Sequence, residues 1–339
     1  MMKTEDFNYE LPARFIAQQP AEPRDHSKLM LMKRGTTHIA HRYFYELIDC
    51  LSPGDLIVVN QTRVIPARFY GSKIPGGGKV EILLLNKKTD ETWECLIGGK
   101  NQQGTKIQVQ EGPLAQVVDV LPGSRRLLRF AEPIECFYRQ AGHVPLPPYI
   151  HAYQGDPERY QTVYNHVPGS AAAPTAGLHF TEGLMAGLKQ KGLNFAEITL
   201  HVGLDTFAPV TESDPHTHQI HTEWCELNAQ TAALINETKA NGKRVIAIGT
   251  TTVRTLETAA QASEGNLVQP FAGNTGLFIL PGYSFKIVDA MVTNFHLPKS
   301  TLLMLVSAFT GKQQILQAYE TAKANDYRFF SFGDAMFLY

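Results

Sequence analysis

Residues 69–142 constrain the fold most, because their pattern of apolar and polar residues differs from that of the chain on either side. Apolar and polar residues alternate there in short runs, and glycine-containing turns separate most of the runs. Alternation with a period of two is typical of half-buried β-strands. The runs cover residues 79–85, 92–97, 105–109, 115–120 and 126–130. We therefore predict a small antiparallel β-barrel over residues 69–142.

The rest of the chain predicts a mixed α/β domain. The apolar runs 56–59 and 245–248 have the length of buried strands. Residues 227–241 have helical spacing and end at Gly242, and another helix starts near Thr252. Polar, turn-rich segments lie on both sides of the barrel, at 60–68 and 145–150. We therefore predict an α/β main domain of residues 1–68 and 143–339, with the barrel inserted at 69–142.

The run from Gly169 to Thr181 combines small residues, a proline and one histidine. Pro174 fixes its backbone angle φ, and Gly177 permits angles that other residues avoid. Such a segment lets the backbone approach a ligand beside His179, although for one loop of this kind taken alone a tight packing crossover is the favoured explanation. Further polar segments adjoin apolar runs at 60–68, 199–207, 249–254 and 293–301. We interpret them as ligand-site loops at strand ends.

The bulk composition narrows the class of protein. With 339 residues, 43% hydrophobic and 19% charged, the chain has the composition of an ordinary globular protein. Its first residues contain no apolar targeting stretch, and no run is long enough to cross a bilayer, so we expect a cytoplasmic protein without a membrane partner. The four cysteines are scattered without a CxxC pair, which argues against a zinc or disulfide framework. A formal charge of −1 provides no global attraction for nucleic acid.

Three closely spaced histidines leave a metal site open as an alternative. His216, His218 and His221 could ligate a metal ion and would then indicate a metal-dependent hydrolase or lyase. The preceding residues 213–215 and the intervening polar residues are more typical of a turn, and no second ligand group accompanies them. A non-catalytic RNA-binding module, in which the barrel alone acts, is the second alternative.

Short motifs follow one another in a fixed order along the whole chain. They are FNYELP (7–12), EPRD (22–25), PGD (53–55), the segment 60–68, PLPPYI (145–150), YQTVY (160–164), the segment 173–181, the loops at 199–207, 249–254 and 293–301, and YRFFSFGDAM (327–336). By these motifs the whole chain resembles the S-adenosylmethionine:tRNA ribosyltransferase-isomerase family of queuosine biosynthesis. Three positions depart from the family pattern: Gln61, Asp205 and Thr222.

The resemblance implies a particular reaction. The ribosyl group of S-adenosylmethionine is transferred to 7-aminomethyl-7-deazaguanine in a tRNA anticodon and isomerised to give epoxyqueuosine, while adenine and methionine leave. S-adenosylmethionine is then a co-substrate, and the partner is tRNA. The route begins with removal of a ribose 5′ proton, so it needs a base and oriented polar contacts but no metal or redox cofactor. No obligate protein partner is implied.

Candidate site residues come from the motifs. Histidines are the natural proton shuttles, because their ordinary pKa is about 6.5. We rank His179 first for its neighbouring small residues, although each histidine could instead have a structural role. The candidates for proton transfer are His179, His201, His221 and His296; those for S-adenosylmethionine are Tyr160, Pro174, Thr175, Ala176, Gly177, Phe180, Thr250, Thr251, Arg254, Asn294, Lys299 and Ser300; those for tRNA are Arg14, Asn60, Arg63, Arg68, Arg125, Arg126 and Arg129.

Overall fold

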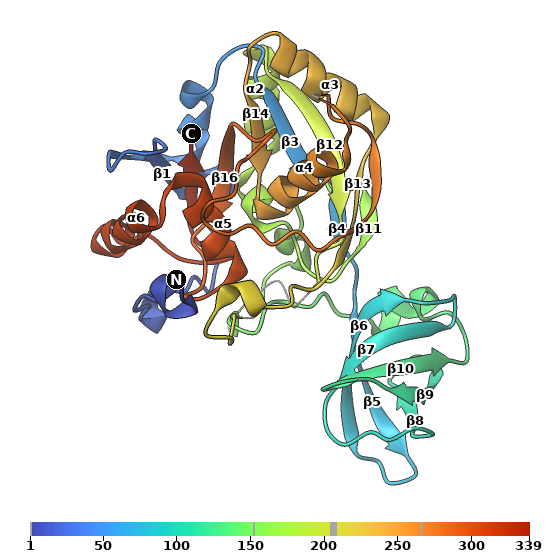
Figure 1. Cartoon of the computed structure of the whole chain (residues 1–339). Coiled ribbons are helices and arrows are strands. Elements are labelled where there is room, and N and C mark those ends of the chain that lie inside the picture. Colours follow the sequence, from blue (N-terminus) through green and yellow to red (C-terminus); the bar gives the residue numbers. More distant parts are fainter. Residues whose placement is uncertain (1, 152, 204–208, 266) are drawn as a thin grey trace. The chain divides into compact units, whose positions relative to one another are not determined.

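The computed structural model describes residues 2–151, 153–203, 209–265 and 267–339. The chain divides into two compact units, which we describe separately (Figure 1). The main unit contains Met1–Arg63, Pro148–Val167 and Ala173–Tyr339, and the barrel unit contains Val64–Pro147 and Pro168–Ala172. The barrel unit therefore extends beyond the predicted insertion 69–142 at both ends and takes in part of the small-residue run.

A nine-stranded mixed sheet forms the centre of the main unit, in the order β15-β13-β12-β3-β14-β16-β17-β1-β2. The four neighbours β12, β3, β14 and β16 are parallel, so their carboxyl ends meet at one edge of the sheet. The strands are β1 (Lys28–Met32), β2 (Ile39–Tyr43), β3 (Leu56–Asn60), β12 (Asn194–Leu200), β13 (Glu223–Leu227), β14 (Val245–Ile248), β15 (Phe271–Thr275), β16 (Ala290–Asn294) and β17 (Ala335–Leu338).

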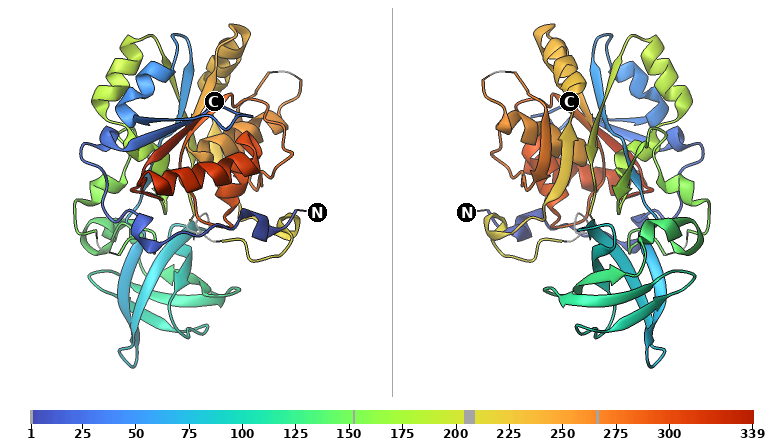
Figure 2. Two further views of the ribbon diagram at one scale, coloured as in Figure 1. Left: turned by 90° about the vertical axis from the view of Figure 1, so that its left-hand side faces the viewer. Right: turned by 90° about the vertical axis from the view of Figure 1, so that its right-hand side faces the viewer.

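Helices cover both faces of this sheet, which explains why β3 and β14 are uninterrupted apolar runs. Helices α3 and α4 contact β3, β12 and β14, whereas α2 packs on η4 over the other face. In Figure 2, α2 (yellow-green) and α3 (gold) lie on opposite sides of the strands. The helices are α2 (Glu182–Gln190), α3 (Ala229–Ala240), α4 (Thr250–Ala262), α5 (Thr301–Thr310) and α6 (Lys312–Ala324).

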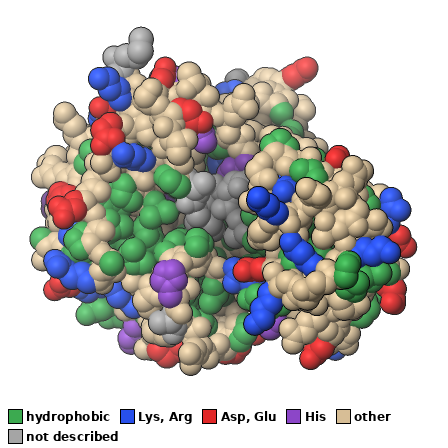
Figure 3. All heavy atoms as spheres, turned by 90° about the horizontal axis from the view of Figure 1, so that it is seen from below, with side chains coloured by type: hydrophobic (Ala, Val, Ile, Leu, Met, Phe, Trp, Pro, Cys, Tyr) green, Lys and Arg blue, Asp and Glu red, His purple; other side chains and the backbone are tan. Residues whose placement is uncertain are grey.

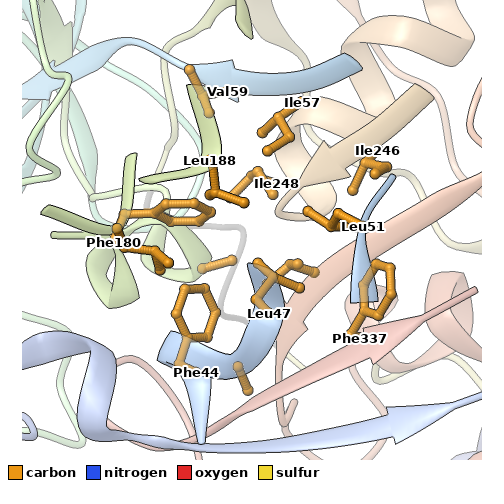
Figure 4. Close-up of a cluster of buried hydrophobic side chains, with 14 of the residues drawn as sticks. Phe44, Leu47, Leu51, Ile57, Val59, Phe180, Leu188, Ile246, Ile248 and Phe337 are labelled. Atoms are coloured by element: carbon orange, nitrogen blue, oxygen red, sulfur yellow. The ribbon is translucent and has the colours of Figure 1, made fainter. Parts of the chain in front are cut away.

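Short 3₁₀ segments complete the main unit and position several motif residues. Segment η4 (Phe44–Cys50) inserts Phe44 and Leu47 between α2 and the sheet, where they meet Ile57, Ile248 and other apolar side chains (Figure 4). The other segments are η1 (Thr4–Phe7), η2 (Ala13–Phe15), η3 (Arg24–His26), η6 (Pro157–Tyr160), η7 (Thr175–His179) and η9 (Pro215–Thr217). The small-residue run thus ends in one turn of 3₁₀ helix, η7.

The barrel unit contains a closed six-stranded antiparallel barrel, which confirms the predicted fold class of an α/β domain with an inserted barrel. Its order is β10-β7-β6-β5-β8-β9. The strands are β5 (Arg68–Ile74), β6 (Lys79–Lys87), β7 (Thr92–Ile97), β8 (Lys106–Val109), β9 (Leu114–Val120) and β10 (Arg125–Phe130), followed by η5 (Ile134–Phe137) and α1 (Tyr138–Ala141). The short strands β4 (Thr62–Val64) and β11 (Val167–Ser170) pair where the chain passes between the units.

One barrel strand, β5, has no counterpart among the five predicted runs. Its burial does not alternate regularly, and Gly71 interrupts its side-chain pattern. A Cβ atom at Gly71 would lie 2.6 Å from the carbonyl oxygen of Gln108 on β8. The glycine is therefore required by close backbone approach inside the barrel wall. Over the described residues, no helix has the length and apolar character needed to cross a membrane.

Candidate active site

A pocket of about 600 Å³ opens in the main unit at the carboxyl ends of β14 and β16. Ligand sites of open α/β sheets lie at this edge. The lining is neutral, with hydroxyl, amide and imidazole groups among apolar side chains. It consists of Tyr149, Ala173, Pro174, Thr175, Ala176, Val202, Gly249, Thr250, Thr251, Thr293, Asn294, Phe295, His296, Leu297, Ser300, Leu302, Phe330 and Ser331.

The amino terminus of α4 forms one wall of this pocket. The chain leaves β14 through Gly249, whose φ of 89° is in the left-handed region that favours glycine. Thr250 and Thr251 then begin the helix, and no side chain caps it. The first backbone N–H groups of a helix have no partners within it and carry a partial positive charge. This wall can therefore accept a carboxylate or another anion.

Asn294, at the end of β16, connects three segments of the wall. Its side-chain oxygen accepts a hydrogen bond from the Thr175 hydroxyl at 3.0 Å. Its amide nitrogen lies 3.1 Å from both the Phe330 carbonyl oxygen and Nε2 of His179. Phe330 has a φ of 70°, which is strained for a non-glycine residue. The Asn294 side chain thus holds a strained backbone turn against β16 and η7.

His296 lines the pocket and retains an unused ring nitrogen. Its Nε2 lies 2.7 Å from the Thr293 hydroxyl, while Nδ1 has no hydrogen-bond partner in the described parts of the chain. The residue is 8% exposed, and burial lowers the pKa of the imidazole to about 3. The ring is therefore neutral at pH 7, and its Nδ1 carries a lone pair whenever Nε2–H donates to Thr293.

His179, the first-ranked candidate, lies behind the pocket wall. Its Nδ1 is 2.7 Å from the Ser27 hydroxyl, and its Nε2 is bonded to Asn294. The ring stacks on Phe44 with 5.0 Å between centroids. Burial, followed by the charges of Arg328 and Arg24, lowers its pKa to about 3. His179 therefore does not line this pocket, and both of its ring nitrogens have partners.

The other two candidate histidines do not line the pocket. His201 stacks on Trp224 with 5.4 Å between centroids, and its Nδ1 lies 2.9 Å from the Thr62 hydroxyl. Burial lowers the pKa of His201. His221 lies 3.4 Å from a carboxylate oxygen of Glu223. Asp205, in the His201 loop, lies outside the described residues.

The predicted ligand Arg254 is instead part of a buried ion pair. Its guanidinium is bonded to Glu223, and its Nε donates to the Leu277 carbonyl at 3.2 Å. Burial raises the pKa of Glu223, but the hydrogen bond from His221 and the charge of Arg254 outweigh it and lower the pKa to about 2. The pair fastens α4 to β13, and the positive charge of Arg254 is neutralised by protein.

Four more predicted ligand residues also lie away from the pocket lining. Phe180 points into the hydrophobic core (Figure 4), and the Tyr160 side chain is completely buried. A Cβ atom at Gly177 would collide with the Tyr164 hydroxyl, so this glycine serves packing. Lys299 forms an ion pair with Glu5 at 2.6 Å. By contrast, Pro174, Thr175, Ala176, Thr250, Thr251, Asn294 and Ser300 all line the pocket, although Ser300 also caps α5.

The three histidines of the metal alternative each face a different carboxylate. His216 pairs with Asp214 at 2.8 Å, His218 pairs with Glu212 at 2.8 Å, and His221 faces Glu223. Nowhere in the described ranges do three or more His, Cys, Asp or Glu side chains converge as metal ligands. The side chains are therefore arranged as separate local pairs, and the geometry gives the metal-dependent alternative no support.

Comparison with known proteins identifies the family. The family model described as queuosine biosynthesis protein matches residues 4–338. The chain belongs to the queuosine biosynthesis protein family. A protein of Finegoldia magna named S-adenosylmethionine:tRNA ribosyltransferase-isomerase is 49% identical over 99% of this chain and 98% of its own. A protein of the same name from Moorella thermoacetica is 48% identical over 99% of this chain and 100% of its own.

A solved structure extends this similarity to the fold. The crystal structure of S-adenosylmethionine tRNA ribosyltransferase from Thermotoga maritima is 40% identical, with a TM-score of 0.58, and the match covers 98% of this chain and 100% of that one. The resemblance inferred from the motifs is thus confirmed. The expected class of enzyme, a transferase and isomerase of tRNA modification, agrees with the names of these relatives.

Within this queuosine biosynthesis family member, the predicted tRNA residues differ in availability. The Asn60 side chain is completely buried and bonds the backbone of Leu200, so it connects β3 to β12 rather than facing solvent. Arg63 is paired with Glu158, and Arg14 lies over the Phe15 ring. On the surface in Figure 3, basic and acidic side chains are interspersed, in agreement with the small net charge.

The barrel arginines also differ from one another. Arg68 pairs with Glu81 at 3.0 Å, and Arg125 lies 3.4 Å from Glu94. Arg126 donates to the backbone carbonyls of Asn101 and Gly123, so it supports loops of the barrel. Arg129 is exposed and forms no ion pair with any described residue. Among the predicted barrel arginines, Arg129 is therefore the one most available to a phosphate.

Ten of the lining residues were not among the predicted site residues, and three of these come from motifs to which no ligand contact was assigned. Tyr149, Phe330 and Ser331 line the pocket, and the Tyr149 hydroxyl is 2.6 Å from that of Ser331. All three lie in quoted motifs, 145–150 and 327–336, so a signal was present in the sequence. Their participation depends on a long-range contact between these motifs, which no local pattern reveals.

Proposed function

We propose that this chain transfers and isomerises the ribosyl group of S-adenosylmethionine onto 7-aminomethyl-7-deazaguanine in tRNA, with adenine and methionine as leaving products. Full-length similarity to relatives that carry the corresponding name supports the activity. The observation that carries the assignment to a site is the pocket at the ends of β14 and β16, which joins a helix amino terminus to a buried imidazole with a free nitrogen.

The pocket suits the parts of S-adenosylmethionine. Apolar walls with a few directed polar groups are typical of sites for ligands of this size. The uncapped α4 terminus at Thr250 and Thr251 supplies N–H groups for the methionine carboxylate. None of the described lining residues is Asp, Glu, Lys or Arg. The sulfonium is therefore not neutralised by a neighbouring carboxylate, and it continues to acidify the adjacent ribose carbon.

His296 is the proposed base for the ribose 5′ proton. A base must be neutral before the reaction and must have a nitrogen available to the substrate. Among the four candidate histidines, His296 alone lines the pocket, and its Nδ1 has no partner in the described structure. Thr293 orients the ring through Nε2. Asn294 positions η7 and the turn at Phe330, and its own polar atoms are occupied.

Product analysis tests the proposed function. Adenine should be released from S-adenosylmethionine only when a tRNA or anticodon stem-loop carries the aminomethyl deazaguanine, because attack by that amine completes the reaction. The measurement is chromatographic separation of the products, with an unmodified stem-loop as the control. Abundant S-adenosylhomocysteine, which indicates methyl transfer, would contradict the proposal.

A further inference from the structure

A second, smaller pocket in the main unit is bordered by His179. Two arginines, two serines and the His179 ring contribute to its lining: Arg24, Arg159, Ser27, Ser331 and His179. Ser331 also lines the larger pocket. The function proposed above assigns no ligand to this second pocket.

The two arginines retain donors for a ligand. Arg24 donates Nη1 to the Gln161 carbonyl at 2.5 Å and Nη2 to the Glu158 carbonyl at 3.1 Å, which fixes its position. Arg159 donates Nη2 to the Ala21 carbonyl at 2.6 Å. Each guanidinium carries five N–H donors, so most donors of the pair have no partner among the described residues. Burial, followed by the charge of Arg159, lowers the pKa of Arg24.

The carboxylate that pairs with Arg159 belongs to Glu22, and this ion pair is largely exposed on the Glu22 side. Glu22 lies 2.9 Å from Arg159, but its side chain is 77% exposed, whereas that of Arg159 is 17% exposed. Exposed ion pairs of this kind contribute little stability, about 0–1 kcal/mol. A ligand anion that binds both guanidiniums can therefore replace the contribution of Glu22 at little cost.

The hydrogen bonds of His179 fix the direction of a donor chain that ends in the second pocket. The Phe330 carbonyl can only accept, so the Asn294 atom that faces it is the amide nitrogen. That nitrogen also donates to Nε2 of His179, which makes Nε2 the acceptor and places the ring proton on Nδ1. Nδ1–H then donates to the Ser27 oxygen.

Ser27 consequently has an unused proton. Its side chain is almost completely buried, and its oxygen accepts from His179, so its own O–H has no acceptor among the described residues. Ser27 lines the second pocket, where only an added acceptor can satisfy this donor. The chain Thr175–Asn294–His179–Ser27 therefore runs from the larger pocket to the smaller one, and each residue donates to the next one along it.

We propose that the second pocket is an oxyanion subsite, in which Arg24, Arg159 and the Ser27 hydroxyl bind one phosphate or carboxylate group. Two guanidiniums and a hydroxyl match the acceptor geometry of such groups. The inference rests on the proposed function for its natural ligand: a backbone phosphate of the tRNA, or the carboxylate of the co-substrate if that carboxylate binds here in place of the amino terminus of α4. His179 is then a positioning residue that connects the subsite to Asn294 in the larger pocket.

Inorganic phosphate provides a test that does not depend on the enzymatic reaction. At constant ionic strength, phosphate should raise the Tm of the parent chain, because binding to the folded state stabilises it. Arg24→Gln and Arg159→Gln should lose this rise, while Arg42→Gln, an exposed arginine paired with Glu46, should retain it. If Arg24→Gln fails to fold because Arg24 also holds two carbonyls, Arg159→Gln alone decides. An equal rise in Arg159→Gln and Arg42→Gln overturns the proposal.

Two binding measurements identify the source of the oxyanion. If it is a phosphate of the nucleic acid, the Kd of an anticodon stem-loop should rise about 10-fold in the variants, and the slope of log K against log salt should decrease by about 1. If it is the carboxylate, the Kd of S-adenosylmethionine should rise instead. Either result supports the subsite, and unchanged values for both ligands contradict it. If the parent chain binds phosphate but binds neither the stem-loop nor S-adenosylmethionine, the result contradicts the proposed function. It does not contradict the oxyanion subsite.

Discussion

Single residues differ in what they contribute even when their chemistry is the same, and the two buried histidines are the clearest case. His179 and His296 are both nearly inaccessible, and burial lowers both pKa values to about 3. Their hydrogen bonds differ: His179 uses both ring nitrogens, and His296 uses one. The difference predicts different responses to the same substitution.

His296→Gln should lower the single-turnover rate by about 10²-fold or more, because glutamine can bond Thr293 but cannot take a proton. Its Tm and its affinity for S-adenosylmethionine should stay near those of the parent. The matched variant His179→Gln should lower Tm more than rate, since it disturbs contacts to Ser27 and Asn294. Rates and Tm measured on the same preparations separate the two roles. A rate for His296→Gln within about threefold of the parent would exclude it as the base.

The same histidines predict a pH dependence of stability. Their folded pKa of about 3 is below the ordinary value of about 6.5, so the unfolded chain binds more protons between these limits. The contribution of each histidine to the free energy of unfolding is therefore fully present above pH 6.5. It is lost as the pH falls toward 3, by up to about 1.4 kcal/mol per pH unit for each ring. Chemical denaturation at pH 7 and pH 5 measures the loss. His296→Gln should remove roughly half of the histidine contribution at pH 5; an unaltered dependence would contradict this assignment.

At the scale of elements, the ion pair of Arg254 and Glu223 holds α4 against β13. Removing one partner of a buried pair leaves an uncompensated charge, which costs about 3–5 kcal/mol. We expect Glu223→Gln to lose this much free energy of unfolding. The control Glu226→Gln, on the same strand β13, should lose little because Glu226 is only partly buried. Urea denaturation compares the two variants. Equal stability would show that the pair does not fasten the helix.

Elements were more predictable than the roles of individual side chains. The bounds of the five predicted barrel runs agree with the strands to within about two residues, because alternation is a local signal. Strand β5 was not predicted, because Gly71 is required by the close approach of the β8 backbone, which is a long-range contact. The loop at Thr250 was expected directly after the apolar run 245–248, whereas strand β16, which ends at Asn294, was not predicted. The two loops meet because parallel neighbours bring their carboxyl ends to one edge. The roles of Arg254 and Phe180 depend on residues that are distant in the sequence, and no local spacing predicts those contacts.

At the scale of the whole molecule, the formal net charge of −1 and the interspersed charges on the face in Figure 3 indicate that any attraction for tRNA is local. Two neighbouring barrel arginines allow this to be tested. Arg129→Gln should reduce the salt dependence of stem-loop binding without a change in Tm, because its side chain is exposed and not ion-paired within the described structure. Arg126→Gln should lower Tm, since its guanidinium bonds backbone carbonyls. An identical salt slope for parent and Arg129→Gln would remove this position from the tRNA surface.

The strand order of the main sheet has a consequence for synthesis of the chain. Strand β17 lies between β16 and β1. In the described sheet, β1 pairs with β17 on one side and with β2 on the other. The hairpin of β1 and β2 emerges from the ribosome before all other strands, yet its place in the sheet exists only after Ala335–Leu338 has been made. Until then β1 presents an unpaired, largely apolar edge. The nascent chain therefore carries an aggregation-prone edge until β17 has been made, and β17 is the strand that ends this exposure.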